Sequence, residues 1–141
     1  MVLTSIIITI IYLLLIGSFI FGFDRILVFK LKNMDSKTRF SVVIPFRNEV
    51  ENLTDLLKSI TSLKYPNHLF EIIFIDDDSN DGSVKLIRNF ISNVQTDIKI
   101  TSNERASNSP KKDAITTAVK QSKYEWIITT DADCVLPKYW L

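Results

Sequence analysis

The sequence predicts an apolar helix followed by an α/β domain with a mostly parallel sheet. Three observations support this class. Residues 2–23 carry no charge, whereas all 17 Lys and Arg and all 16 Asp and Glu lie at or beyond Asp24. From Phe40 onward, short β-branched runs alternate with segments whose apolar residues repeat at helical spacing, as in sheets with crossover helices. Polar residues gather where the predicted strands end.

Composition excludes several classes of function. The net charge of +1 gives no broad basic surface, so no nucleic-acid partner is expected. One cysteine excludes a disulfide framework and a multi-thiolate zinc site. The three glycines at positions 17, 22 and 82 cannot form a dinucleotide fingerprint or a P-loop.

The first predicted element is a membrane-spanning helix, VLTSIIITIIYLLLIGSFIFGF (2–23). At about 1.5 Å per residue it would be roughly 33 Å long, which matches the roughly 30 Å apolar core of a bilayer. A cleaved signal peptide would have a basic segment before the apolar run and a small-residue cleavage site after it. A buried helix of a soluble domain would show a polar stripe. Neither pattern is present, so a retained anchor is favoured.

The residues after this run predict its orientation. The flank is predominantly basic, with Arg25, Lys30, Lys32, Lys37 and Arg39 against Asp24 and Asp35. The positive-inside tendency therefore predicts a single-pass protein of the cell membrane, with its domain in the cytoplasm. Residues 26–31 either continue the helix or lie along the membrane surface. We divide the chain into an anchor with its juxtamembrane segment (1–31), a polar linker (32–39) and a domain (40–141).

Within the domain the predicted elements alternate in order. FSVVIPF is a short β-branched run that suits a buried strand, and EIIFID and EWIITTD are similar. Between them, apolar residues recur every three or four positions, as on one face of a helix. The predicted order is strand 40–46, helix 51–63, strand 71–76, helix 84–94, strand 98–101, helix near 114–119 and strand 125–131.

Asp131 and Asp133 follow the last predicted strand directly. Two carboxylates one residue apart repel each other, by roughly 1 kcal/mol at about 4 Å in water. A divalent cation such as Mg²⁺ removes this repulsion and binds one or two carboxylates together with phosphate oxygens. Alternatively, Asp133 caps a helix that begins near Pro137. The two interpretations are equally supported by the motif alone.

Two further polar segments stand at similar positions. An acidic run, Asp76 to Asp81, follows the apolar strand IIFI directly. Its Asp81, or a neighbouring serine, could cap the following helix, and its other carboxylates could bind the hydroxyls or ring N–H groups of a nucleotide. Lys111 and Lys112 begin the third helix, where the macrodipole disfavours cations, so they are either solvated or bind phosphate.

Together these segments resemble the N-terminal, nucleotide-binding half of family 2 glycosyltransferases, which have the Rossmann-like GT-A fold. The resemblance rests on FSVVIPFRNEVENL, EIIFIDDDSNDGS, SPKKDAITTAV and WIITTDADCVLP, in this order, and covers about residues 40–141. It implies inverting transfer of a sugar from a nucleotide-sugar donor, often a UDP-sugar, with Mg²⁺ or Mn²⁺. The acceptor, a saccharide or a lipid-linked molecule, is not specified.

The resemblance also assigns roles to individual residues. Pro45, Asn48 and Glu49 would line the nucleoside pocket. Asp77 would contact the base, with Asp76 beside it. Lys112, or Lys111, would face the ribose and diphosphate. Asp131 and Asp133 correspond to the D-x-D motif of the family, with Asp133 as the expected direct metal ligand.

Two features depart from the family pattern. The usual glycine before the lysine segment is Pro110 here. The catalytic carboxylate base of the family lies in a second half, so we expect it beyond Leu141 and interpret these residues as an N-terminal fragment that is inactive alone. A phospho-receiver domain fits poorly, because the first predicted strand ends in PFRNE. A non-catalytic nucleotide-sugar-binding module on a membrane anchor stays as the alternative function.

Overall fold

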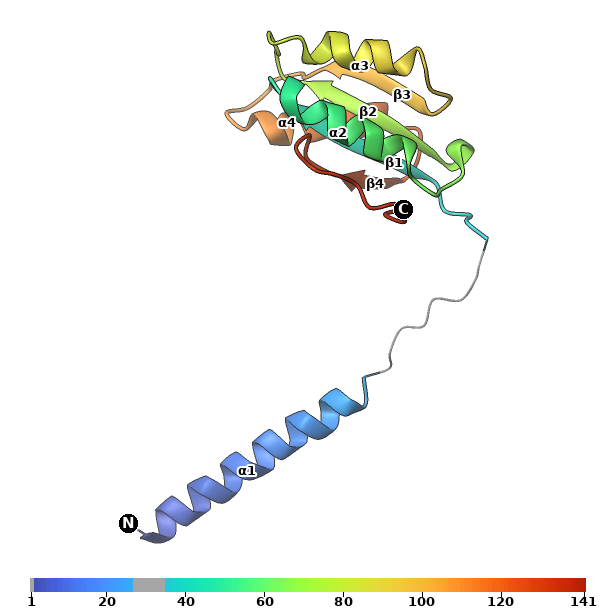
Figure 1. Ribbon diagram of the computed structural model, residues 1–141. Coiled ribbons are helices and arrows are strands. Elements are labelled where there is room, and N and C mark those ends of the chain that lie inside the picture. Colours follow the sequence, from blue (N-terminus) through green and yellow to red (C-terminus); the bar gives the residue numbers. More distant parts are fainter. Residues whose placement is uncertain (1, 27–34) are drawn as a thin grey trace. The chain divides into compact units, whose positions relative to one another are not determined.

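The computed structural model describes residues 2–26 and 35–141, in two compact units, Met1–Met34 and Asp35–Leu141. The first unit contains helix α1 (Val2–Asp24; Figure 1). Its apolar side chains are spread around the whole helix, without a polar stripe. Among the described residues it is the one helix whose length and composition suit a membrane span. The predictions for Lys30, Lys32 and the rest of 27–34 lie outside the described residues.

The second unit is built on a four-stranded sheet in the order β3-β2-β1-β4. Every pair of neighbouring strands is parallel, so the predicted fold class is confirmed. Register places Phe46 opposite Asp76 and Asp76 opposite Ser102, which brings the ends of three strands level. The strands are β1 (Phe40–Phe46), β2 (Phe70–Asp76), β3 (Asp97–Ser102) and β4 (Trp126–Thr129).

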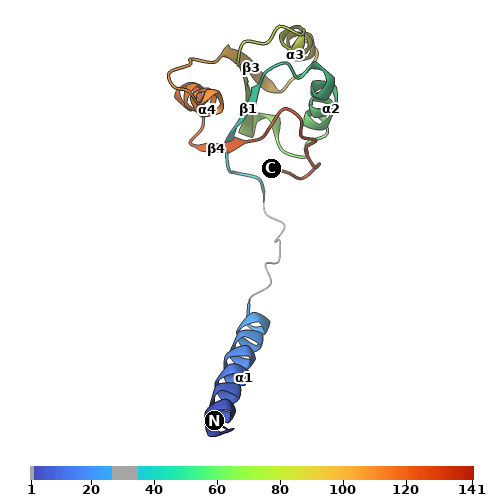
Figure 2. The ribbon, with the colours of Figure 1, turned by 90° about the vertical axis from the view of Figure 1, so that its left-hand side faces the viewer.

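Helices cover both faces of this sheet. Helices α2 (Val50–Thr61) and α3 (Ser83–Ile91) lie on one face, and α4 (Pro110–Gln121) lies on the other (Figure 2). A short 3-10 helix, η1 (Asn67–Leu69), precedes β2. The last strand is shorter than predicted, because β4 ends at Thr129 rather than residue 131.

The central strands β1 and β2 have apolar side chains on both faces, and each face has its own core. Val42, Ile44 and Phe74 pack with the apolar side of α2, including Leu53 and Leu56. On the other face, Val43, Ile73 and Ile75 pack against two small residues of α4, Ala114 and Ala118. Burial of both faces explains why these strands read as continuous apolar runs.

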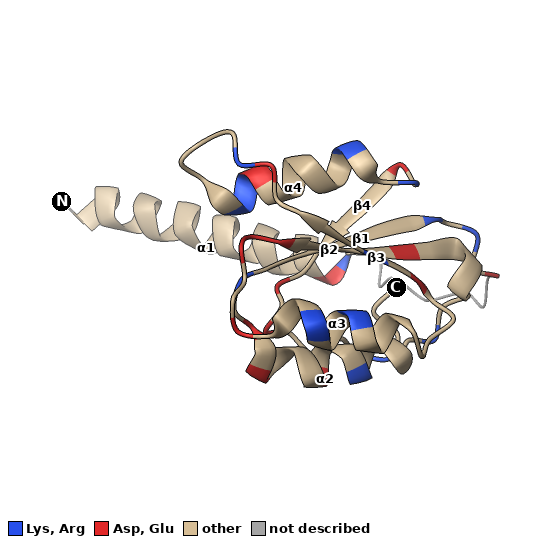
Figure 3. Cartoon of the chain, turned by 90° about the horizontal axis from the view of Figure 1, so that it is seen from above, with Lys and Arg blue, Asp and Glu red and all other residues tan. Residues whose placement is uncertain are grey.

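Strand order reverses between β1 and β4. The chain moves from β1 outward to β2 and β3, then crosses back through α4 to β4 on the other side of β1. A crevice forms at such a reversal, beyond the carboxyl ends of the strands. The loops before α2 and α3 and the first turn of α4 bring charged residues to this end of the sheet (Figure 3).

Candidate functional site

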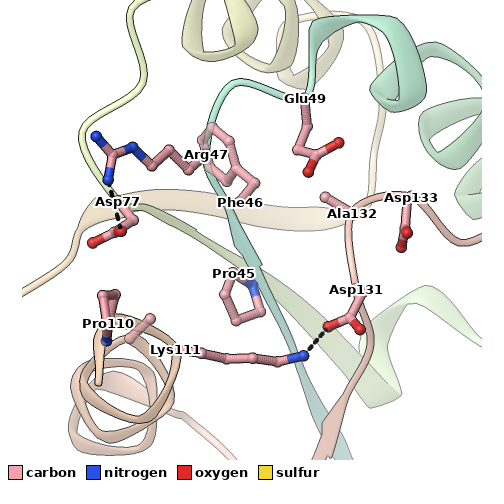
Figure 4. A pocket seen from close by; sticks show the side chains of 11 residues that line it. Pro45, Phe46, Arg47, Glu49, Asp77, Pro110, Lys111, Asp131, Ala132 and Asp133 are labelled. Atoms are coloured by element: carbon pink, nitrogen blue, oxygen red, sulfur yellow. Dashed lines mark hydrogen bonds and ion pairs between the residues drawn. The ribbon is translucent and has the colours of Figure 1, made fainter. Parts of the chain in front are cut away.

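A cavity of about 350 Å³ lies at the carboxyl ends of β1 and β4 (Figure 4). It is lined by Pro45, Phe46, Arg47, Glu49, Asp77, Pro110, Lys111, Ala114, Asp131, Ala132 and Asp133. Six residues predicted from the sequence are therefore together: Pro45, Glu49, Asp77, Lys111, Asp131 and Asp133. Asn48, Asp76 and Lys112, which were also predicted, are not among the lining residues.

Pro45 determines where β4 leaves the sheet. The amide of Thr130 donates to the carbonyl of Val43 across the β1–β4 ladder (3.1 Å). The next donor on that side of β1 would come from position 45, and proline has no N–H. The ladder therefore stops, and the chain turns away at Ala132 and Asp133. This break releases the two carboxylates from the sheet and directs them to the cavity.

Asn48 has a structural position beside the cavity. Its backbone is left-handed, with φ of 56°, a conformation that asparagine tolerates better than most residues. Its amide donates to Ser79 Oγ (3.0 Å), and its Oδ1 accepts from the amide of Asn80 (2.8 Å). Asn48 thereby joins the loop after β1 to the loop after β2.

The acidic run after β2 supports the same two loops. Asp81 Oδ2 accepts from the amide of Val50 at the start of α2 (3.0 Å), and its Oδ1 accepts from the amide of Ser83 at the start of α3 (3.0 Å). Asp76 Oδ1 accepts from the amide of Ser79 (3.0 Å). Asp81 is not the N-cap residue of either helix, since these are Glu49 and Gly82, but it accepts from the first amide of both. The hydroxyl of Ser83, followed by backbone amides, lowers the pKa of Asp81 despite some desolvation.

Asp77 differs from its neighbours because cationic side chains hold it. Arg105 donates from Nε to Oδ1 (2.7 Å) and from Nη2 to Oδ2 (2.6 Å), and Asn103 donates to Oδ1 (2.7 Å). Arg47 Nη1 lies 3.9 Å from Oδ2. The Arg105 hydrogen bonds lower the pKa of Asp77 and outweigh its burial, with Asn103 assisting. The carboxylate is therefore ionised and fixed in orientation.

Sequence reasoning missed Arg47, Asn103 and Arg105. Asn103 and Arg105 follow β3 directly, so the signal used elsewhere, polar residues after a strand end, would have found them. The Oδ1 of Asn103 is buried, and no partner for it occurs among residues 2–26 and 35–141. An unpaired buried acceptor beside a fixed carboxylate and an arginine suits a ligand with N–H donors and carbonyl acceptors.

Lys111 faces Asp131 across the cavity. Its Nζ lies 2.6 Å from Asp131 Oδ1, and both side chains are more than half exposed. The hydrogen bond to Asp131 raises the pKa of Lys111, and the charge of Asp133 adds to the effect. Lys112 is exposed, and its ammonium group forms no hydrogen bond or ion pair within the described residues.

The carboxylates after β4 are compatible with a divalent cation. Residues 134–141 form no helix, so Asp133 caps no helix within the described residues. The described residues contain no cluster of three or more His, Cys, Asp or Glu arranged around one point. Two carboxylates still fit Mg²⁺, whose other ligands are commonly substrate phosphates and water. The ammonium group on Asp131 shows that this position attracts positive charge.

A parallel sheet with reversed strand order, and a cavity with carboxylates at the reversal, defines an α/β domain of the GT-A type. Comparison with known sequences gives the family. The profile described as glycosyl transferase family 2 matches residues 41–141, so the chain belongs to glycosyl transferase family 2.

Curated relatives and solved structures agree with this family. The chain is 34% identical over 114 residues to a poly-beta-1,6-N-acetyl-D-glucosamine synthase of Staphylococcus epidermidis, covering 81% of this chain and 26% of that protein. It is 32% identical over 101 residues to glycosyltransferase AglE of Haloferax volcanii, covering 72% and 32%. The structure of S. aureus TarS 1-349 in complex with UDP superposes with a TM-score of 0.63 at 27% identity, covering 72% and 29%. The chain thus spans about a quarter to a third of these proteins' lengths.

Proposed function

We propose that this chain supplies the donor-binding part of a membrane-anchored glycosyltransferase that transfers a sugar from a nucleotide sugar, most simply a UDP-sugar, to a saccharide or lipid-linked acceptor. The observation that carries the proposal is the single cavity that collects Asp77, Lys111, Asp131 and Asp133 from three separate segments. Two TarS structures at 27% and 28% identity, with UDP and with UDP-GlcNAc, support a uridine nucleotide.

The base would be bound at the end of β2. Uracil presents one N–H donor between two carbonyl acceptors, so it needs an acceptor flanked by donors. Asp77 and Asn103 Oδ1 offer acceptors, and the guanidinium of Arg105 offers donors at 44% side-chain exposure. Their rigid mutual hydrogen bonds would keep this edge preorganised, which reduces the entropy lost on binding.

The diphosphate would lie between the start of α4 and the carboxylates after β4. Lys111 offers a mobile ammonium group, and the first turn of α4 offers backbone amides, since Ser109 makes no side-chain cap. Asp131 and Asp133 would hold Mg²⁺ or Mn²⁺, which supplies charge neutralisation for the departing diphosphate. Pro45 and Glu49 would line the space beside the nucleotide.

We also propose that α1 anchors the protein in the cell membrane, with residues 1–31 as anchor and juxtamembrane segment, 32–39 as linker and 40–141 as cytoplasmic domain. Support comes from the evenly apolar surface of the 23-residue α1 and from the basic flank that follows it. A cytoplasmic domain would have direct access to the nucleotide-sugar pool and to acceptors in the membrane.

Donor binding can be tested with the full chain in detergent micelles by titrating UDP with and without Mn²⁺. Loss of a hydrogen bond to a charged group costs about 1.5–3 kcal/mol, so Asp77→Asn should weaken UDP binding about ten- to hundredfold. Asp133→Asn should chiefly remove the dependence of UDP binding on Mn²⁺. Asp55→Asn is a matched control, because Asp55 lies on α2 in an exposed pair with Lys58. Unchanged UDP binding in both site variants would contradict the proposal.

A further inference from the structure

The charged groups around the cavity do not balance. Its lining contains four carboxylates and two cations, namely Glu49, Asp77, Asp131 and Asp133 against Arg47 and Lys111. Arg47 lies by Asp77, which Arg105 also holds, and Lys111 lies by Asp131. Glu49 accepts from the neutral amide of Asn52, and no ion pair is formed by Asp133 among the described residues. The lining therefore has an excess of negative charge where an anionic diphosphate is expected.

We propose that Lys111 is a tethered counter-ion of Asp131 that is exchanged during donor binding: Lys111 releases Asp131 to a divalent cation and turns to the diphosphate. This inference rests on the proposed function and adds a second role for Lys111 beyond phosphate contact. Without nucleotide, Lys111 would compete with the metal for Asp131. With nucleotide, Lys111 and the metal would both bind the diphosphate.

Exposure of the pair favours such an exchange. The side chains of Lys111 and Asp131 are 65% and 55% exposed, and exposed ion pairs contribute little to stability. By contrast, the Glu71–Lys99 pair has its carboxylate buried, at 2% exposure, and separating it would leave a buried charge unpaired. The Lys111–Asp131 contact can therefore open without damage to the fold.

The position of Lys111 would allow its ammonium group, once released from Asp131, to bind the diphosphate instead. Lys111 belongs to the first turn of α4, where the helix dipole repels a cation and attracts an anion. Pairing with Asp131 offsets this unfavourable placement. A bound diphosphate at the same helix end would offset it equally well, and its charge would compensate for the loss of Asp131.

The exchange makes a prediction that a simple phosphate contact does not. Without nucleotide, removing Lys111 should strengthen the binding of Mn²⁺, because Asp131 becomes free and a nearby positive charge is lost. With nucleotide, the same change should weaken UDP binding, because the diphosphate loses a cation. Lys111→Arg keeps the charge and should behave like the wild-type chain in both respects.

The test is a titration of the full chain in micelles with Mn²⁺ alone, followed by electron paramagnetic resonance of the free ion, and then with UDP at saturating Mn²⁺. We expect Lys111→Met to bind Mn²⁺ about three- to tenfold more tightly and UDP about tenfold more weakly. Lys112→Met is the matched control and should leave Mn²⁺ affinity unchanged.

The outcomes separate this inference from the proposed function. If the wild-type chain binds UDP with Mn²⁺ but Lys111→Met has unchanged or weaker Mn²⁺ affinity, the exchange is wrong and donor binding stands. An equal gain of Mn²⁺ affinity in Lys112→Met would mean that the loss of any nearby positive charge explains the effect. That result would also overturn the exchange. If the wild-type chain binds neither Mn²⁺ nor UDP, both proposals fail.

Discussion

Replacing Glu71 with glutamine should destabilise the domain. Glu71 lies at the amino ends of the strands, opposite the cavity. Glu71 lies on β2 with 2% of its surface exposed. Its Oε1 accepts from Ser41 Oγ (2.6 Å) and from the amide of Lys123 (2.5 Å), and its Oε2 lies 3.0 Å from Lys99 Nζ. Ser41 Oγ accepts in turn from the amide of Tyr124 (3.1 Å). These bonds attach the connection between α4 and β4 to the two central strands.

The magnitude follows from what glutamine keeps and what it loses. The amide oxygen can still accept from Ser41 and Lys123, but each bond falls from the charged range of about 1.5–3 kcal/mol to the neutral range of about 0.5–1.5 kcal/mol. The Lys99 pair adds about 1 kcal/mol or less, since Lys99 is partly exposed. A neutral side chain avoids part of the desolvation cost of the carboxylate. We expect a net loss of about 2 kcal/mol, or roughly 10 °C in melting temperature.

Urea unfolding of the full chain in micelles measures this loss. Trp126 and Trp140 are the two tryptophans of the chain, and both belong to the domain, so their fluorescence reports its unfolding separately from α1. Asp55→Asn, at an exposed position of α2, should stay within about 0.5 kcal/mol of wild type. A Glu71→Gln chain as stable as wild type would refute the argument that this network holds the α4–β4 connection.

Acid should reduce the difference in unfolding free energy between the wild-type chain and Glu71→Gln. Burial alone would raise the pKa of Glu71, but the bonds from Ser41, Lys123 and Lys99 together lower it. A carboxylate with a lowered folded pKa stabilises the protein above its unfolded pKa of about 4.3, and this contribution is lost as the pH falls through the folded pKa. The stability gap between wild type and Glu71→Gln should therefore be constant near neutrality and narrow below about pH 4.3.

Two further predictions concern the donor site and the membrane. Arg105→Leu should weaken UDP binding at least tenfold in calorimetric titrations, because Asp77 loses both short guanidinium bonds. The control Arg88→Leu, on α3, should leave UDP affinity unchanged. Equal effects of the two substitutions would contradict a specific role for Arg105. Protease added to intact cells should leave residues 40–141 uncut and should digest them after lysis; cleavage in intact cells would contradict the cytoplasmic orientation.

The strand and helix order could be predicted because it depends on local patterns. FSVVIPF and FEIIFID became β1 and β2, whose two buried faces need continuous apolar residues. The end of β4 could not be placed in this way. It depends on register, since Pro45 meets the β4 ladder only when Val43 pairs with Thr129. A boundary determined by a distant partner strand is not visible in the sequence around EWIITTD.

The site was predictable in part for the same reason. Residues at strand ends were found because the carboxyl ends of parallel strands meet at one edge. The same rule applied after β3 would have indicated Asn103 and Arg105, but their hydrogen bonds to Asp77 are visible only in the folded chain. That Lys111 rather than Lys112 lines the cavity also required structure, since neighbouring residues on a helix point about 100° apart.

The side-chain exposure of three ion pairs in this domain determines which roles each pair can have. The carboxylate of Glu71 has 2% of its side chain exposed and bonds to backbone of the α4–β4 connection, so it can only hold structure. Asp77, at 11%, is fixed by Arg105, whose own side chain is 44% exposed; this pair can keep its geometry while it presents donors to a ligand. Asp131 and Lys111 are both more than half exposed, so water can replace either partner at little cost. Of these three pairs, Lys111–Asp131 is the most exposed and lies at the cavity, where its opening would require no rearrangement of the sheet.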